Sequence, residues 1–557
     1  MATLDDDTNR TLRADSVNSS VDAVNHKSND NACDKDNTQY PPLPKVIVIM
    51  LSLYLAIFLV ALDRTIITTA TPRITDTFNS LGDIGWYGSA YLLTCCSFQL
   101  VFGRVYTFYS PKWVFLAAIL LFEIGSVVSG AAPSSTVFIV GRAIAGIGAS
   151  GLSSGVIVIM VHMAPLHKRP MYTGILGGVF GIASIVAPMM GGAFTDNVSW
   201  RWCFYINLPI GAVTIVIVAL VLQLPEASNG QLSARERLQK LDPIGTALFL
   251  PGMICLLLAL QWGGTTYAWS SGRVVALLVL AVVLLLAFIA VQHWKKDDGT
   301  VPPRIFLRRS IVSGFWYSFM LNGSMMVILY YIPIWFQAVK DASPVKSGIM
   351  TLPMVIGLVL GSIFAGAGVT NSGYYTPFMI VGSILLSVGS GLMTTFTTST
   401  GHAQWIGFQA CFGLGIGFGM QQPGAAAQTV LAPQDVPTGV SLIFFAQYFG
   451  GALWISVANN VFSNRLAESI SSMVHGIDAG RIVNVGATAV RSVVDPDQLP
   501  AVLKAYNNAV VDAFYVAVAC ACATALGSLA MEWKSMKPEG GGGGRWAKKE
   551  NVDKEAA

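Results

Sequence analysis

The run Gly174-Ile-Leu-Gly177-Gly-Val-Phe-Gly181-Ile-Ala-Ser-Ile-Val-Ala-Pro188-Met-Met-Gly191-Gly192 is apolar and long enough to cross a bilayer. Gly177 and Gly181 are four residues apart, so they share one helix face, where a neighbouring helix can approach backbone to backbone. Pro188 removes a backbone donor and permits a kink. A helix that only anchors a protein needs neither feature, although tight packing in any polytopic protein would also account for them.

The composition places most of the chain in a membrane. Of 557 residues, 53% are hydrophobic and 11% are charged, whereas an ordinary soluble domain has about 25% charged residues. A single soluble core stops growing near 250–300 residues, so the excess apolar surface has to face lipid. The net charge of +4 is small for this length and argues against nucleic acid as a partner.

The sequence offers no residues for an enzyme, a metal site or a cofactor. The eight cysteines lack the paired spacing of a zinc site. No phosphate-binding G-x-x-x-x-G-K-[ST] pattern is present, so nothing indicates that ATP drives the protein. Gly146-Ile-Gly148-Ala-Ser-Gly151 matches a dinucleotide pattern, but it lies inside an apolar run and is better explained by helix packing.

A membrane helix needs about 20 mostly apolar residues. This criterion predicts an all-α membrane protein with about fourteen spans, near 46–66, 84–106, 113–132, 136–160, 171–194, 201–223, 243–262, 274–293, 311–336, 347–368, 376–396, 403–425, 437–461 and 510–531. Two similar glycine turns, after Gly103 and after Gly366, lie eight spans apart, which suits two six-span halves with two helices inserted between them.

The predicted organisation has five parts. They are a disordered cytoplasmic tail (1–44), a first six-span half (45–223), a linker with two extra spans (224–300), a second six-span half (301–532) with an outer loop at about 464–508, and a disordered cytoplasmic tail (533–557). In the outer loop, the spacing of Leu466, Ile470 and Met473 predicts a short amphipathic helix outside the bilayer.

Lys and Arg in short loops predict the orientation. With the N-terminus inside, the cytoplasmic loops hold about twelve of them and the opposite loops about five. Both termini are therefore expected to be cytoplasmic. Asn197-Val-Ser199 is a glycosylation sequon on the outer side, close to the membrane.

Three ionisable residues within the spans are candidates for proton coupling: Asp63 in the first span, Glu123 in the third and Arg142 in the fourth. Each costs several kcal/mol in a bilayer unless it is paired or hydrated. A buried carboxylate takes up a proton more readily, and a nearby arginine opposes this, so moving the arginine would load or release a proton. A static ion pair between spans one and four is the simpler alternative.

Aromatic and amide side chains inside the spans suggest a cavity for greasy, moderately polar molecules. Interfacial belts and contacts between helices are the alternative for part of this set. The candidates are Tyr91, Gln99, Trp316, Asn322, Gln421, Gln422, Phe445 and Gln447.

Several of these stretches together resemble the drug:proton antiporters of the major facilitator superfamily. Ala187-Pro188-Met-Met-Gly191-Gly192 is similar to their fifth-span motif, with Ala187 where Gly is usual. Leu62-Asp63-Arg64-Thr65-Ile66 through Pro72 resembles the first-span signature of the fourteen-span branch, and Gly141-Arg142 through Ala149 resembles the fourth-span motif. Phe122–Ser126 and Trp200–Pro209 are similar to stretches of fungal members.

The family's loop motif G-x-L-a-D-r-x-G-r-k is degraded here. Gly103 and Lys112 match it, but Thr107 and Pro111 stand where an acid and an arginine are usual. The resemblance therefore implies that the usual gating charge pair is missing or replaced.

The resemblance implies a monomeric, proton-coupled efflux antiporter in the cell membrane. Its substrates would be hydrophobic or amphiphilic small molecules such as fungal toxins, secondary metabolites or drugs. A carrier for basic amino acids or siderophores, in the vacuolar or plasma membrane, is the alternative within the fold, and a non-transporting membrane sensor is the alternative from another class. Asp63, Glu123 and Arg142 would couple protons, and the conformational motif would comprise Gly174, Gly177, Gly181, Pro188, Gly191 and Gly192.

Overall fold

The computed structural model describes residues 40–80, 83–224, 235–236, 240–264, 266–473 and 494–537. These residues form helices, with an isolated bridge between Gly263 and Tyr267. All elements below belong to one compact unit that begins at Leu43. Most of the two predicted tails, and most of residues 226–241 of the predicted linker, lie outside the described residues.

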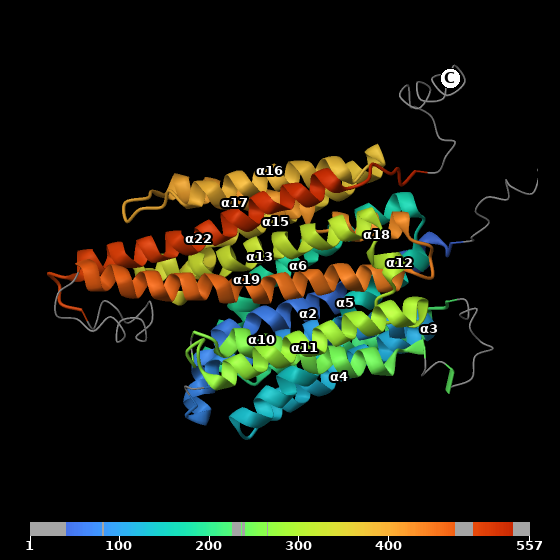
Figure 1. The fold of residues 1–557 in the computed structure, drawn as a ribbon, viewed down its shortest axis with the longest axis horizontal. Helices are drawn as coiled ribbons and strands as arrows, with labels where there is room; N and C mark the ends of the chain where they lie inside the picture. The colour runs from blue at the N-terminus through green and yellow to red at the C-terminus, as the bar shows by residue number, and fades with distance from the viewer. Residues whose placement is uncertain are drawn as a thin grey trace, which may run out of the picture. The chain divides into compact units, whose positions relative to one another are not determined.

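The first half consists of α2 to α8 (Figure 1). Its helices are α2 (Leu43–Phe78), α3 (Ile84–Phe108), α4 (Pro111–Ala131), α5 (Ser135–Met163), α6 (Arg169–Asn197), α7 (Trp202–Tyr205) and α8 (Asn207–Val221), with a 3-10 turn, η3 (Leu166–Lys168), before α6. Among these, α5 packs between α3 and α4, and α2 packs against α6 and α8. The glycines of α5 that face α3 and α4 have no room for a side chain, which is why these helices lie so close together.

The second half repeats this arrangement with different helices. They are α13 (Arg309–Ala338), α14 (Pro344–Met350), α15 (Leu352–Ser372), α16 (Thr376–Met393), α17 (His402–Gly419), α18 (Gln422–Val430), α19 (Val436–Met473) and α22 (Leu499–Ala530). Here α13 packs against α19 and α22, and α17 packs against α15 and α16. The two halves meet where α6 packs on α15 and where α3 packs on α19.

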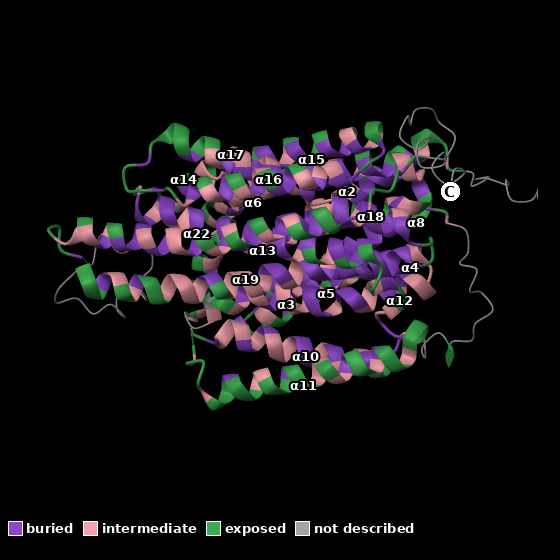
Figure 2. Cartoon of the chain, turned by 45° about the horizontal axis from the view of Figure 1, so that its top comes forward, coloured by how far each residue is buried: buried purple, intermediate pink, exposed green. Residues whose placement is uncertain are grey.

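The two extra helices, α10 (Pro243–Trp262) and α11 (Gly272–Lys295), form a hairpin beside the seam between α3 and α19. Contacts with both halves hold α10 there: Trp86 of α3 packs edge-on against Trp262, and Phe249 packs against Phe445 of α19. Within the turn of the hairpin, Trp269 donates to Asn460 Oδ1 of α19 at 2.8 Å. Figure 2 shows that α11 is largely unburied, as expected for a helix that faces lipid.

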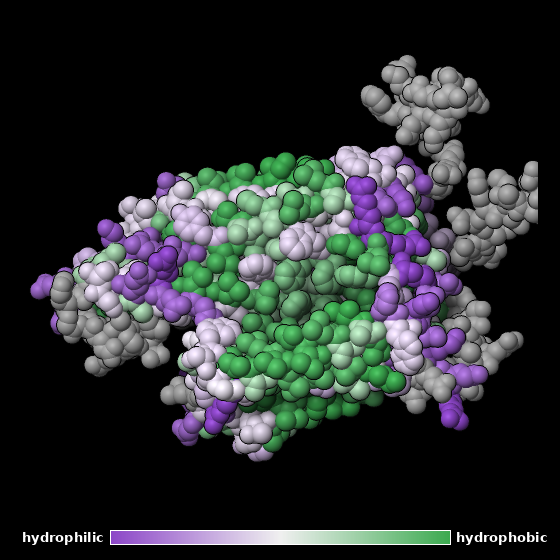
Figure 3. All heavy atoms as spheres, in the orientation of Figure 1, coloured by the Kyte–Doolittle hydropathy of each residue, from purple (hydrophilic) through white to green (hydrophobic). Residues whose placement is uncertain are grey.

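Each predicted span coincides with a helix, or with two successive helices, of the described residues. Twelve of these helical segments are long and apolar enough to cross a membrane. The segments α3 and α17 are not among the twelve, because polar residues and glycines dilute their apolar content, so the count of fourteen remains a prediction. Figure 3 shows hydrophobic side chains across the middle of one face and hydrophilic side chains at both ends, the pattern of a protein that spans a bilayer.

Residues 466–473 are helical, as predicted, but the prediction that they form a short helix of their own is wrong. These residues continue α19 without a break, and Leu466 and Ile470 are fully buried in the core of the second half. Their apolar spacing therefore marks a helix face that packs against other helices. In addition, α22 begins at Leu499, inside the predicted outer loop, and residues 533–537 of the predicted tail lie against the turn after α15, where Met536 N donates to Gly373 O.

Candidate functional site

A fully buried ion pair joins α2 to α5. Arg142 Nη1 donates to Asp63 Oδ2 at 2.6 Å, and the two side chains are 1% and 0% exposed. Charges at this depth cost several kcal/mol each unless they are paired. Arg64, the sequence neighbour of Asp63, points to α13 instead, where its Nη2 lies 3.1 Å from Met326 Sδ. The structure therefore unites Asp63 and Arg142, two of the three predicted coupling residues, in one site.

Other groups fix the Arg142 guanidinium on its remaining sides. Its Nε donates to the backbone carbonyl of Tyr87 at 3.1 Å, and its Nη2 reaches the carbonyl of Asp63 at 3.5 Å. The ring of Tyr91 lies 4.6 Å from the guanidinium carbon and that of Phe204 lies 5.8 Å away. Tyr91, which the sequence placed in the substrate cavity, thus belongs to the ion-pair site. A planar guanidinium satisfies all these contacts at once, which an ammonium group cannot do.

Asn207 connects the ion pair to α4. The helix is interrupted at Ile206, between α7 and α8. Pro209 lies in the first turn of α8, where its missing N–H is tolerated. The break places Asn207 at the start of α8, with its Nδ2 at 3.4 Å from Asp63 Oδ1 and 3.1 Å from Ser126 Oγ. The sequence pattern contains Asn207 but assigns it no role, although an amide inside an apolar run was an available signal.

Glu123, the third predicted coupling residue, lies one turn before Ser126 on α4. Its side chain is 6% exposed, and among the described residues neither of its carboxylate oxygens has a hydrogen-bond partner. Gly211 on α8 provides the space for this carboxylate, because a methyl group there would overlap Glu123 Oε1. Glu123 is therefore close to the ion pair without being part of it.

The glycines of α6 line its contact with α15, which is one of the two places where the first and second halves of the protein meet. We call this contact the seam between α6 and α15. A methyl group at Gly174 would lie 2.6 Å from the carbonyl of Ser362, and one at Gly177 would lie 2.5 Å from the hydroxyl of the same residue, both on α15. A methyl group at Gly181 would overlap Val359. This seam lies near the end of the bundle at which α2 begins and α22 ends, which we call the terminal face (Figure 1).

The rest of this motif lies farther along α6, which continues as a helix through Pro188. Gly191 faces α2, where a methyl group would overlap Thr69, whereas Gly192 has open space beside it. Asn197, the sequon residue, ends α6 and is exposed. The predicted close-packing face of α6 therefore has two parts, with α15 near the terminal face and α2 farther away.

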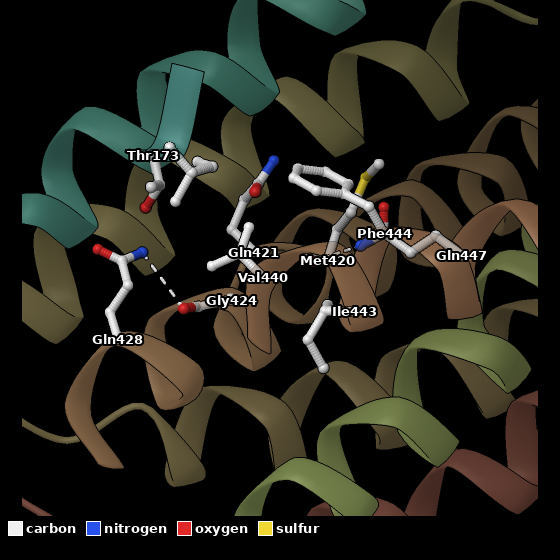
Figure 4. A pocket seen from close by; sticks show the side chains of 10 residues that line it. Thr173, Met420, Gln421, Gly424, Gln428, Val440, Ile443, Phe444 and Gln447 are labelled. Carbon is white, nitrogen blue, oxygen red and sulfur yellow. Dashed lines mark hydrogen bonds between the residues drawn. The ribbon is translucent and has the colours of Figure 1, made fainter. Parts of the chain in front are cut away.

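Three glutamines surround a small cavity between the halves (Figure 4). Its volume is about 10 Å³, which suits about one water molecule. Gln421 and Gln447 were predicted cavity residues, and Gln428 joins them, while Thr173 of α6 lines the opposite side. The described lining residues are uncharged, so this part of the seam presents amides and apolar groups.

The other predicted cavity residues occupy different places. Gln99 donates to Ser154 at 2.5 Å, and Ser154 contacts Ser441 of α19 at 3.0 Å, so Gln99 lies at the seam between the halves. Asn322 is buried beside Gly451, and Gln422 is buried at the start of α18. Two aromatic candidates face away from the amides: Trp316 is half-exposed and donates to a carbonyl of α22, and Phe445 packs against Phe249 of the extra hairpin.

At the terminal face, the degraded loop motif still contacts the second half. A methyl group at Gly103 would lie 2.7 Å from the Ser441 side chain, so α3 and α19 touch there. Thr107, which replaces the usual acid, has its hydroxyl 3.4 Å from that of Thr438 on α19. Lys112 caps the other side of the loop by donating to the carbonyl of Ala219 at 2.7 Å. The loop motif thus packs against α19 with a hydroxyl pair in place of a charge.

A charge cluster that the sequence did not reveal lies beside this contact. Arg304 of α12 (Pro303–Phe306) donates to both carboxylate oxygens of Asp435, at 2.6 and 2.8 Å, just before α19 begins. Its Nε also donates to Asp297 in the turn η4 (Lys296–Asp298) at 2.5 Å. Arg104 of α3 donates to the backbone carbonyls of Lys240 and Asp297. The linker around the extra hairpin therefore ties α3 to the start of α19.

Asp242, at the start of α10, anchors this linker. Its carboxylate is fully buried and accepts from Lys295, Gln292 and the backbone N–H groups of Gly245 and Thr300. Burial alone would raise the pKa of Asp242, but these donors outweigh it and lower the pKa to about 2. The carboxylate therefore remains charged at any physiological pH and holds the two ends of the hairpin together.

On the efflux activity that the family resemblance implies, we expect Asp435→Asn to slow transport about two- to fivefold, because the bidentate, partly buried pair with Arg304 ties the linker to the second half. Asp297→Asn is the matched control: Asp297 meets the same arginine by one contact but is 68% exposed, and such pairs contribute little. Initial rates of substrate efflux at equal membrane abundance would measure both. Equal effects of the two substitutions would contradict this account of the cluster.

The helical bundle, the apolar belt and the buried ion pair define a polytopic membrane transporter. The sequence profile of the Major Facilitator Superfamily matches residues 53–455, and the chain belongs to this superfamily. It is 54% identical to the MFS-type transporter VdtG of Byssochlamys spectabilis, over 90% of each chain, and 51% identical to the MFS-type efflux pump MFS1 of Trichophyton rubrum, over 92% of this chain and 96% of that one.

A solved structure of the proton:xylose symporter XylE shares the fold, with a TM-score of 0.54 and 16% sequence identity over 81% of this chain and 96% of that one. The prediction of a major facilitator fold is confirmed by the family match and by this structural likeness. The functional roles of the individual site residues, by contrast, remain predictions, although the structure gives their positions and contacts.

Proposed function

We propose that this protein is a proton-coupled efflux antiporter for hydrophobic or amphiphilic small molecules, such as fungal secondary metabolites, toxins or drugs. The observation that carries the proposal is the fully buried ion pair between Asp63 and Arg142. A related protein that is half identical bears the name of an efflux pump, which supports the direction of transport.

The ion pair provides a way to exchange a proton for a substrate. While Arg142 contacts Asp63, the guanidinium donates to the carboxylate and balances its charge. If a rearrangement moves the guanidinium away, the buried carboxylate loses its counter-charge and takes up a proton from water that has entered the site. Return of Arg142 then releases the proton, so one cycle can couple a proton to a conformational change.

The packing at the terminal face supports an alternating-access cycle. Close contacts of α6 with α15, and of α3 with α19, leave a cavity of only about 10 Å³ among the glutamines. A drug-sized ligand needs a site of roughly 300–1,000 Å³. Substrate would therefore enter from the terminal face only after these two contacts separate, and their closure would expel it toward the other side.

The remaining assignments complete the proposal. Residues 45–223 and 301–532 would act as the two moving halves, with 224–300 as the linker that carries the extra hairpin. The terminal face would be cytoplasmic, the protein a monomer in the cell membrane, and Glu123 a further proton-carrying residue. Gln421 and Gln447 would contact the substrate, because they face the seam that must open.

A carrier for basic amino acids would need carboxylates in its cavity. Among the described residues that line the cavity, the polar side chains are glutamines and a threonine, and none is acidic. This observation favours neutral or weakly polar substrates over basic amino acids or siderophores. A membrane sensor without transport activity would not require the close, glycine-lined seam between α6 and α15.

Efflux of a fluorescent drug from cells that lack their own pumps tests the proposal. We expect expression of the protein to lower drug accumulation and a protonophore to restore it to the level of cells without the protein. One charge that crosses 100 mV supplies about 2.3 kcal/mol, enough for an outward gradient of roughly fiftyfold. Efflux that continues unchanged after the proton gradient has collapsed would contradict proton coupling.

A further inference from the structure

We propose that Asn207 is a positioning residue that couples Glu123 to the ion pair of Asp63 and Arg142, so that the first half holds two linked carboxylates. This inference rests on the proposed function. It is carried by the contacts of the Asn207 amide group with two helices and by the burial of Glu123 without a hydrogen-bond partner among the described residues.

The contacts occupy two successive helical turns along the interface of α4 and α8. At one level, Asn207 Nδ2 lies 3.1 Å from Ser126 Oγ, and at the next, Glu123 packs against Gly211. Within each helix these residues are three or four positions apart, which corresponds to about 4.5–6 Å along the axis. The same Asn207 Nδ2 also lies 3.4 Å from Asp63 Oδ1. One amide group therefore touches the ion pair and the hydroxyl one turn from the second carboxylate.

Within the described part of the chain, three buried oxygen atoms in these two turns lack a hydrogen-bond donor. Among the described residues, Glu123 Oε1, Glu123 Oε2 and Asn207 Oδ1 are buried and have no donor. A buried acceptor without a donor costs about 1–3 kcal/mol. A proton on Glu123 would turn one of its acceptors into a donor, and a bridging water could connect this donor to Asn207 Oδ1, the unsatisfied acceptor one turn away. Protonation of Glu123 would then draw on the amide group that holds Asp63.

Other charged groups near this interface are already engaged elsewhere. Arg64 points to Met326 of α13. Arg201 donates to carbonyls at the outer end of α4, and Lys112 donates to Ala219 at the opposite end of the interface. Tyr205 packs against Gly130 near that outer end. Asp63 and Arg142 are thus the charged pair to which Glu123 is connected through Asn207.

The link gives the cycle a specific sequence of events. With Arg142 on Asp63, the amide group of Asn207 donates toward Asp63 and Ser126. When Arg142 leaves and Asp63 takes up a proton, Asp63 becomes a donor and needs an acceptor, which Asn207 Oδ1 supplies after the amide group turns. Asn207 Nδ2 then no longer donates to Asp63 or Ser126. The hydrogen-bonding groups available to Glu123, one turn away, change as a result. Protonation of Asp63 therefore changes the hydrogen bonding of Glu123.

The test uses purified full-length protein in proteoliposomes and measures two processes. Proton-driven transport is recorded as a function of pH, and substrate counterflow, which needs no net proton movement, is recorded beside it. We expect Asn207→Leu to shift the pH at half-maximal proton-driven transport by about one pH unit and to lower its rate about tenfold, with counterflow kept within about twofold. A purely structural role would reduce both processes together.

A double-mutant cycle with Glu123→Gln decides whether the two residues are linked. If they are, Asn207→Leu should shift the pH profile much less in the Glu123→Gln background than in the wild type, because the effects of coupled residues are not additive. Additive shifts would overturn the inference. If wild-type transport proves independent of the proton gradient, the proposed function itself fails, and that result is distinguishable because it appears before any variant is made.

Gly211→Ala provides a second route if Asn207→Leu does not reach the membrane. The added methyl group overlaps Glu123 Oε1 and must displace this carboxylate, so we expect a similar shift of the pH profile with counterflow retained. Gly391→Ala in α16 is the matched control, because a methyl group there meets nothing within 4 Å. An unchanged pH profile in Gly211→Ala would count against a role for Glu123 at this position.

Discussion

Arg142→Lys is expected to lower proton-driven efflux by roughly ten- to a hundredfold, the equivalent of losing charge-assisted hydrogen bonds worth about 1.5–3 kcal/mol. The guanidinium contacts Asp63 twice, donates to the Tyr87 carbonyl and lies over the ring of Tyr91. A lysine keeps the charge but has one point from which to donate, so it cannot hold all four contacts. Initial efflux rates at equal membrane abundance would measure the loss.

The neutral double variant Asp63→Asn/Arg142→Gln separates transport from folding. Each single neutral substitution leaves one buried charge without its partner, which costs about 3–5 kcal/mol of stability. The double variant removes both charges, so we expect its thermal stability in detergent to recover toward that of the wild type while proton-driven efflux stays near background. Wild-type, gradient-dependent efflux in the double variant would show that the pair is only a static link between α2 and α5.

Much of the fold follows from local features of the sequence. Apolar runs of about 20 residues locate the helices, and their ends carry ordinary signals. Ser134 caps α5 by accepting from Val137 N, and Ser271 caps α11 by accepting from Val274 N. Such caps involve residues within one turn of each other, so helix ends can be predicted without knowing what packs against the helix. The same limit applies to Leu466 and Ile470: their spacing did not reveal that α19 continues to Met473 or that it packs against α22.

The candidate site depends on contacts between distant residues, which no local pattern determines. Asp63 is adjacent to Arg64 in sequence, yet it pairs with Arg142, because consecutive helix residues point in directions about 100° apart and α5 lies on the Asp63 side. Arg304 and Asp435 likewise meet across 131 positions. Arg142 was a candidate because it is a charged residue inside an apolar span, whereas Asn207 carries no charge and became visible only through its contacts with Asp63 and Ser126.

Gly177→Ala in α6 is expected to shift the protein away from the arrangement described here. The added methyl group would lie 2.5 Å from the Ser362 hydroxyl, so α6 and α15 must separate slightly to admit it. Overpacking of this kind costs about 1–3 kcal/mol, which changes a two-state equilibrium by roughly 5- to 150-fold. Because the strain exists only while the seam is closed, the open arrangement gains population, and transport slows since each cycle must close the seam again.

Gly178→Ala is the matched control, because its methyl group would meet its nearest neighbours at 3.7–3.8 Å, an ordinary contact distance. In a background without native cysteines, a cysteine at Gln421, which lines the cavity at this seam, reports its opening through reaction with a thiol reagent. We expect faster labelling and slower efflux in Gly177→Ala, and wild-type behaviour in Gly178→Ala. If both variants label and transport like the wild type, the glycine spacing serves packing alone and does not set the balance between open and closed seams.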